Sequence, residues 1–249
     1  MFDIPGIAIL LLLAGGSGWL LQLAWRAGQP VVKWLGTALA GLLTLVLVAA
    51  LGLATMGYWK LNRTHDNPVP EVTIAVTAER VLRGERFEPL CSSCHAGETG
   101  APLAGRDFLS EGDAPPIGRM YAPNLTPTHL ADWSDGEIIR AIREGIHRHG
   151  RGLMIMPSNI FRNLSDADAE AIVAWLRSLE PVEPDTRPTR LNVFGAMLAN
   201  FAPIFRMQEP ITEPRDGAAT GTDGRLWRVP HLDQLRVLPW HEPAGRSCV

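Results

Sequence analysis

Cys91-Ser92-Ser93-Cys94-His95 is the stretch around which the rest of this chain is organised. It reads C-x-x-C-H, the pattern by which a c-type haem is attached. Two thiols separated by two residues can reach the two vinyl groups of one porphyrin and form thioethers. His95 is then held against one face of the ring as the proximal iron ligand. The stretch therefore predicts one covalently bound haem c, held by Cys91, Cys94 and His95.

Two other uses of a C-x-x-C pair compete with haem attachment. A structural zinc site needs two further Cys or His ligands at matching spacing, and the sequence has no second C-x-x-C. A thioredoxin-like redox pair would lie near a βαβ pattern, which the sequence does not show. Both alternatives are weaker than the haem interpretation.

The composition is that of a chain with an apolar N-terminal part and a more acidic remainder. The 249 residues are 46% hydrophobic and 20% charged, and the net charge is -3. Residues 1–63 are basic on balance, so the acidic excess lies after them. An acidic surface favours a basic partner and argues against nucleic acid, although a merely solvated surface has the same composition. The third cysteine, Cys248, is one residue from the end and reads as a free thiol in a frayed tail.

Two charge-free stretches, residues 4–25 and 34–59, open the chain. Each is long enough for a membrane-spanning helix, which needs about 20 apolar residues. A cleaved signal peptide would have a positive start and a shorter apolar core, whereas the only early charge is Asp3. Residues 1–60 are therefore predicted to form a two-helix transmembrane hairpin in a bacterial inner membrane.

The short connection between these stretches sets the expected orientation. It contains Arg26 and Lys33, and basic loops stay on the cytoplasmic side. Both termini and the haem motif then lie on the periplasmic side. Lys60 and Arg63 argue weakly for the reverse, but c-type haem is attached outside the membrane.

The remaining sequence indicates short helices and loops around a cofactor. Residues 61–76 read as a linker, and residues 77–182 as the haem domain. Thr77 to Leu90 is expected to be a helix that kinks or ends at Pro89. Ser134 with Glu137 forms an S-x-x-E capping box before a helix, and a second helix is expected to start near Ser165. No strand pattern appears, so the fold class is mainly α.

A sixth iron ligand is expected from the loop that contains Met154-Ile155-Met156-Pro157. A methionine there can lay its thioether across the distal face of a haem. Methionine is more often core filler, so the residue pattern alone does not choose between Met156 and its neighbour Met154. Further candidates are Met120, His129, His147 and His149.

Several of these motifs together resemble a class I cytochrome c domain. More closely, the chain is similar to the first haem domain of the multihaem cytochrome c subunits of membrane-bound bacterial dehydrogenases for alcohols, gluconate and related substrates. The resemblance covers about residues 78–182. It is carried by Cys91 to His95, Ala122 to Pro127, Trp133 to Asp135, Arg140 to Gly145 and Met154 to Pro157.

The resemblance implies that Met156, followed by Pro157, is the second iron ligand. The sequence also departs from that family, because no second C-x-x-C-H follows. One haem is therefore expected where those subunits carry three, and a two-helix anchor stands in place of their cleaved signal. These departures weaken any inference about alcohol or sugar substrates but leave electron transfer intact.

Residues 183–249 are expected to be an extended, largely irregular extension that docks on another subunit. Its apolar part, from Val193 to Met207, could lie on the membrane surface, contact a partner or pack on the haem domain. The whole chain thus reads as a membrane-anchored single-haem cytochrome. It is expected to pass single electrons between a donor and an acceptor protein within a respiratory or photosynthetic complex, without being an enzyme itself. The alternatives are the electron-accepting subunit of a membrane-bound dehydrogenase and a ligand-binding haem enzyme.

Overall fold

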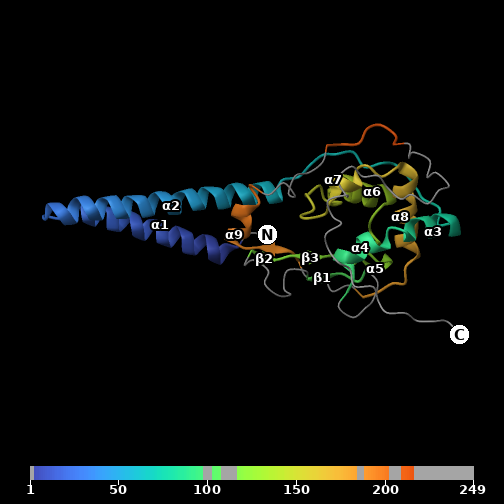
Figure 1. Cartoon of the computed structure of the whole chain (residues 1–249), viewed down its shortest axis with the longest axis horizontal. Coiled ribbons are helices and arrows are strands. Elements are labelled where there is room, and N and C mark those ends of the chain that lie inside the picture. The colour runs from blue at the N-terminus through green and yellow to red at the C-terminus, as the bar shows by residue number, and fades with distance from the viewer. Residues whose placement is uncertain (1–2, 98–102, 108–116, 184–187, 202–208, 216–249) are drawn as a thin grey trace, which may run out of the picture.

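A long helical hairpin projects from a smaller globular part in the computed structural model (Figure 1). The structure describes residues 3–97, 103–107, 117–183, 188–201 and 209–215. The expected docking residues of the tail after residue 215, and Cys248, lie outside these ranges. The described part is mainly helical, as predicted.

The hairpin consists of α1 (Ile4–Trp25) and α2 (Pro30–Asn62). Each is long and apolar enough to cross a membrane, and most of its surface is exposed. Proline occupies the first turn of both helices, where its missing N–H costs nothing. The α2 helix is longer than its charge-free stretch, because it continues through Lys60 to Asn62.

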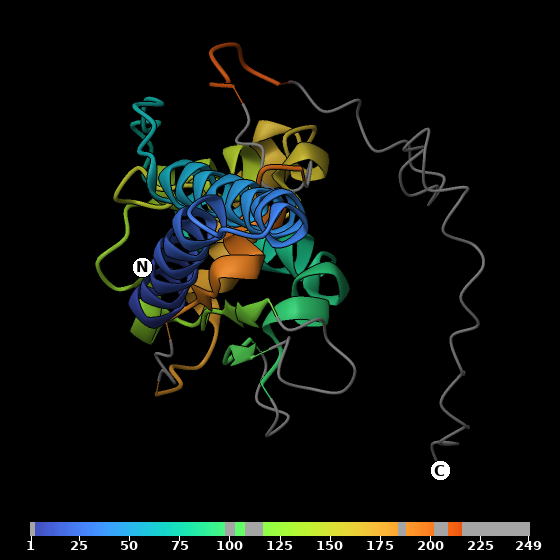
Figure 2. The same cartoon turned by 90° about the vertical axis from the view of Figure 1, so that its left-hand side faces the viewer.

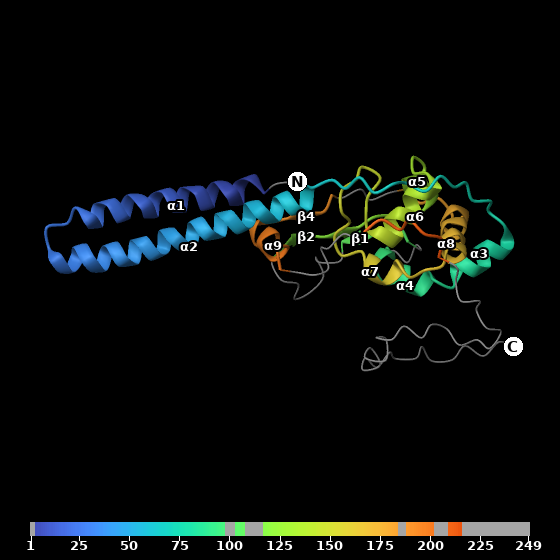
Figure 3. The same ribbon diagram turned by 90° about the horizontal axis from the view of Figure 1, so that it is seen from above.

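The start of α1 and the end of α2 meet at the base of the hairpin, beside the globular part (Figure 3). The buried Tyr58 hydroxyl accepts a hydrogen bond from the Asp3 amide at 3.2 Å and donates to the Leu191 carbonyl at 3.3 Å. Further out, the Thr44 hydroxyl donates to that of Ser17 at 3.0 Å. The N-terminus therefore lies next to the haem domain and not at the far end of the hairpin (Figure 2).

The globular part is built from seven further helices among the described residues. They are α3 (Ala78–Glu85), α4 (Glu88–His95), α5 (Pro127–Leu130), α6 (Asp135–Glu144), α7 (Ser158–Phe161), α8 (Asp166–Ser178) and α9 (Val193–Leu198). The core is formed mainly by α6 and α8, whose apolar side chains include Ile138, Ile142, Ile172 and Trp175. Gly84 of α3 packs on the backbone of Ala171, where a larger residue would overlap.

Local capping explains where the two core helices begin. Ser134 and Glu137 form the predicted capping box, with each side chain bonded to the other's backbone amide. Ser165 caps α8 by accepting from the amide of Asp168 at 3.1 Å. The α6 helix ends at Gly145, whose φ of 71° favours glycine.

The expected helix from Thr77 to Leu90 is two helices. It breaks after Glu85, and Pro89 lies in the first turn of α4 instead of ending a helix. Proline is compatible with a first turn because the N–H it lacks has no helical partner there. The break allows α4 to turn away from α3 and carry the haem motif.

Four two-residue strands form two small antiparallel ladders that were not predicted. β1 (Arg106–Asp107) pairs with β3 (Tyr121–Ala122), and β2 (Gly118–Arg119) pairs with β4 (Arg190–Leu191). Two residues are too few for a periodic pattern to show in the sequence. The second ladder joins the segment before α9 to the loop around the haem motif.

The segment after α2 is bound to the haem domain along its length. The His65 amide donates to the Gly150 carbonyl at 2.8 Å, and the Asn67 side chain donates to the Glu144 carboxylate at 2.6 Å. Further on, the Ile74 amide donates to Asp135 at 2.9 Å. The linker therefore runs along α6 and does not act as a free spacer.

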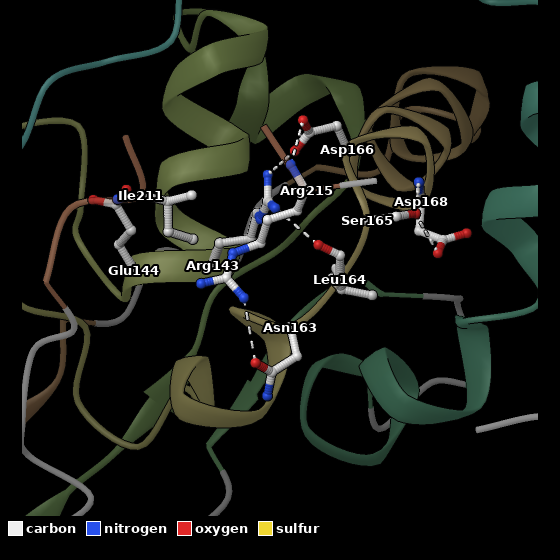
Figure 4. Close-up of polar contacts among 9 residues, drawn as sticks. All are labelled: Arg143, Glu144, Asn163, Leu164, Ser165, Asp166, Asp168, Ile211 and Arg215. Atoms are coloured by element: carbon white, nitrogen blue, oxygen red, sulfur yellow. Dashed lines mark hydrogen bonds and ion pairs between the residues drawn. The ribbon is translucent and has the colours of Figure 1, made fainter. Parts of the chain in front are cut away.

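Residues 209–215 form a second segment that crosses the same side of the domain (Figure 4). The Ile211 amide donates to the buried Glu144 at 3.0 Å, and the Arg215 amide donates to Asp166 at 3.0 Å. Asp166 also accepts from the buried Arg143 guanidinium at 2.6 Å. Glu144 and Asp166 thus hold three separate stretches of chain together.

Candidate functional site

The C-x-x-C-H motif forms the last turns of α4. Cys91 and Cys94 are three residues apart on this helix, so their side chains lie on the same face. Both thiols line one cavity of about 490 Å³, and the buried His95 lines it as well. The structure therefore brings the three predicted motif residues to one wall of one cavity.

His95 is positioned to present a single ring nitrogen to a metal. Its Nδ1 lies 2.7 Å from the carbonyl oxygen of Pro123, which accepts a hydrogen bond from a protonated Nδ1. Burial lowers the pKa of His95, while the Pro123 hydrogen bond partly opposes this shift. A neutral ring that donates from Nδ1 keeps its lone pair on Nε2, which is the arrangement of a metal-ligating histidine.

The loop that carries Pro123 is fixed by buried polar contacts that the sequence reasoning did not identify. The Asn124 side chain donates to the Val182 carbonyl at 3.0 Å and accepts from the Thr126 amide at 2.7 Å. Gly105 packs against this loop at φ 84°, where a side chain would overlap the backbone. The only sequence signal was that Ala122 to Pro127 belongs to the family-like motifs.

The opposite wall of the cavity contains three methionines. Met120, Met154 and Met156 all line it, and Met156 also packs against the main core. Met154 instead packs in a smaller cluster with Met120 and Leu191. The structure therefore keeps Met156 and Met154 as alternative iron ligands.

Ile155 turns the chain between these two methionines. Its φ is 69°, a left-handed conformation that is unusual for a β-branched residue. Such a conformation costs roughly 1–2 kcal/mol and persists only where the surroundings impose it. Here it lets Met154 and Met156, two residues apart, face the same cavity.

The membrane hairpin supplies part of the cavity wall. Tyr58, Leu61 and Asn62 from the end of α2 line it together with the motif residues. These three residues were not predicted to belong to the site, because they are about thirty residues away from the motif and lie in an apparent anchor. The cavity is thus built at the junction of the hairpin and the globular part.

Of the histidines considered as ligands, His129 and His147 line the cavity. His147 stacks edge-on against Trp133, with ring centroids 4.7 Å apart, and against His149. Burial lowers the pKa of His147 to about 4, with a smaller effect from neighbouring positive groups. The expected solvated pair at a helix end is therefore wrong for His147, which is a half-buried, neutral wall residue.

The donor set fits a covalently held haem. Two thiols and a neutral imidazole face a cavity whose other walls are mostly apolar, and thioethers are present opposite. The cavity volume is within the usual range of about 300–1,000 Å³ for cofactor sites. Burial, with help from Glu88 and Cys94, raises the pKa of the Cys91 thiol to about 12, which disfavours a thiolate metal ligand or nucleophile. Among the described residues, no group of three or more His, Cys, Asp or Glu could hold a metal.

The cytochrome c family matches residues 83–180, which include the motif, α6 and α8. Residues 83–180 form a cytochrome c domain. This confirms the expected electron-transfer domain with covalently bound haem c.

Relatives of this cytochrome c domain occur in dehydrogenases. The chain is 37% identical over 167 residues to a nicotinate dehydrogenase subunit of Pseudomonas putida, which covers 64% of this chain and 13% of that protein. It is 33% identical to the gluconate 2-dehydrogenase cytochrome c subunit of Pantoea cypripedii over 41% of this chain and 24% of that subunit. It is 31% identical to the fructose dehydrogenase cytochrome subunit of Gluconobacter japonicus over 52% of this chain and 28% of that subunit.

These names confirm the resemblance to dehydrogenase cytochrome subunits. The chain spans less than a third of the length of each of these three relatives. The likeness is therefore one of the cytochrome c domain and its neighbouring residues.

Proposed function

We propose that this protein is a membrane-anchored cytochrome with a single haem c that relays electrons and does not itself transform a substrate. Cys91 and Cys94 form the two thioethers, His95 is the proximal ligand and Met156 is the distal ligand. When bound, the haem accepts and releases one electron at a time. With both axial positions taken by side chains, no open coordination site is left for a substrate.

The protein residues hold this group and set its surroundings. The Pro123 carbonyl orients the His95 ring, and the apolar side chains of α6 and α8 exclude water from the cavity. A low dielectric and a thioether ligand both favour the reduced state, which suits a carrier that accepts electrons. These roles belong to residues of the chain and need no reacting substrate.

We further propose that the hairpin crosses the inner membrane twice. Residues 1–60 form this anchor, residues 61–76 connect it to the haem domain of residues 77–182, and residues 183–249 form an extension. The basic loop between α1 and α2, with Arg26 and Lys33, is placed in the cytoplasm. The haem domain and both termini are then periplasmic.

The partner that best suits the protein is a dehydrogenase within a respiratory or photosynthetic chain. The names of the three relatives support an electron-accepting role beside a catalytic subunit, with a separate acceptor protein downstream. The observation that carries the proposal is the cavity with Cys91, Cys94 and His95 on one wall and Met156 on the other.

Purification of the full chain in mild detergent, from a bacterium that attaches c-type haem, tests this function. We expect one covalent haem per chain, a one-electron redox titration and co-purifying subunits that mass spectrometry identifies as a dehydrogenase. A monomer without partners would contradict the complex. Rapid binding of carbon monoxide by the native protein would favour the ligand-binding haem enzyme instead.

A further inference from the structure

The outer face of α9, made by Phe194, Leu198 and Phe201, is apolar and exposed although it lies beside the end of the hairpin. The exposed fractions are 49%, 40% and 72%. Their spacing of four and three residues places them on one side of the helix and the turn that follows. The opposite side contains Ala196 and Ala199, both fully buried.

Contacts to both membrane helices fix the position of α9 (Figure 1). The Val193 amide donates to the Asp3 carboxylate at 3.3 Å. The Asn200 side chain donates to the Leu53 carbonyl at 2.8 Å, and Lys60 Nζ donates to the Ala199 carbonyl at 2.6 Å. The short helix therefore lies across the base of the hairpin, between Leu53 and Lys60 of α2.

This placement gives a depth relative to the membrane. Asp3 and Tyr58 mark the level at which α1 begins beside α2. Leu53 is five residues before Tyr58, which at 1.5 Å per residue is roughly 7–8 Å along the helix axis into the charge-free stretch. A helix that lies in the membrane interface is buried by about 5–10 Å, so α9 is at the matching depth.

The surroundings of α9 are those of a membrane interface. Trp59 is 65% exposed at the end of α2, and the Arg63 guanidinium lies 5.6 Å from the centre of its ring. Tryptophan and basic residues with apolar stems are typical of this boundary. The sequence from Leu191 to Phe205 carries no charge, so nothing in it opposes contact with lipid.

We infer that α9 is an in-plane membrane helix, whose outer face inserts into the boundary between phospholipid headgroups and acyl chains. The inference rests on the proposed membrane insertion of α1 and α2. Since β4 precedes α9 and pairs with β2, and Met120 follows β2 into the haem cavity, the helix holds that cavity at a set height above the bilayer. The hairpin alone would fix only the point of attachment.

Site-directed spin labelling tests this contact in the full, haem-loaded protein. In a Cys248→Ser background, single cysteines replace Leu198 or Phe201 and receive a nitroxide label. Leu45→Cys, in the middle of α2, and Leu82→Cys, on α3, are matched references because both side chains are well exposed. The variants are placed in phosphatidylcholine–phosphatidylglycerol nanodiscs, and collisions with oxygen and with a water-soluble nickel chelate are compared.

We expect the labels at positions 198 and 201 to shift towards oxygen, with a ratio between the two references. Labels that match Leu82→Cys, while Leu45→Cys reports lipid, would overturn the inference but preserve the anchor. A Leu45→Cys label in water would instead overturn the anchor itself. Labels shielded from both reagents would show that protein covers α9, which also overturns the inference. The haem absorption spectrum checks folding, and Phe194→Cys substitutes for any variant that fails.

Discussion

Gly57 and Ala196 are in backbone contact across the joint between the membrane hairpin and the haem domain. A Cβ added to Gly57 would overlap the carbonyl group of Ala196. The glycine therefore permits α9 to approach α2 closely enough for the Tyr58 hydroxyl to reach the Leu191 carbonyl. This joint links the anchor to the segment that borders the haem cavity.

The substitution Gly57→Ala is expected to weaken this joint. The added methyl group has to displace backbone, which costs about 1–3 kcal/mol in a packed interior. Thermal unfolding in mild detergent, followed by circular dichroism, should show a lower midpoint. Gly52→Ala is the matched control, because nothing lies within 4 Å of a Cβ built there. Equal midpoints for the two variants would contradict the importance of this contact.

Replacing Met156 with leucine should change the iron ligation while conserving volume. We expect Met156→Leu to lose the methionine–iron charge-transfer band of the oxidised protein and to gain carbon monoxide binding. Met154→Leu and Met120→Leu, which alter other side chains lining the same cavity, should keep the native spectrum. Loss of the band in Met154→Leu alone would transfer the ligand role to that residue.

Asp166→Ala should destabilise the haem domain because it leaves the Arg143 guanidinium buried without its carboxylate partner. Their contact is 2.6 Å, and the Arg143 side chain is only 7% exposed. Breaking a buried pair from one side typically costs about 3–5 kcal/mol, and the exposed carboxylate argues for about 3 here. Denaturant unfolding of detergent-solubilised protein measures the loss. Glu170→Ala, on the same helix, removes a more exposed pair with Arg80 and should cost less than about 1 kcal/mol.

The pKa of His147, lowered to about 4 mainly by burial, predicts a pH-dependent contribution to stability. Its neighbours His149, Arg151, His129 and Arg148 add positive charge and act in the same direction. As pH falls from about 6.5 towards 4, the unfolded chain binds a proton at His147 that the folded protein excludes. The native protein should therefore lose stability in this range, and the loss attributable to His147 should cease below it.

Comparison with His147→Gln isolates this effect. The variant should gain about 1 kcal/mol relative to the native protein between pH 6.5 and 4, a value reduced because the ring is partly exposed. Denaturant unfolding at each pH provides the measurement. Parallel stability profiles for the two proteins would contradict the predicted shift.

Much of the fold was predictable because the relevant signals are local. The spacing of Cys91, Cys94 and His95 is sufficient for haem attachment whatever surrounds it. The capping box at Ser134 and the apolar spacing after it depend only on helical geometry, and α6 begins where they predict. The break between α3 and α4 was missed, because Pro89 is compatible with either the end or the start of a helix.

The composition of the site could not be predicted to the same extent. Met154 and Met156 are two residues apart and appear equivalent in sequence, and the left-handed Ile155 between them has no sequence signature. The Pro123 carbonyl that orients His95 is a backbone group, which any residue possesses. Its role appears only when the loop is folded against α4.

The sequence by itself determined the haem motif, the two apolar helices and the capped helices of the cytochrome c domain, because each depends on neighbours within a few residues. Only the tertiary structure decided that α2 lines the haem cavity, that residues 209–215 bind to Glu144 and Asp166, and that α9 lies across the base of the hairpin. Those contacts join residues from about thirty to more than a hundred positions apart, and the backbone amides and carbonyls that make them are common to every residue. Their pairing is set by the packing of the whole chain.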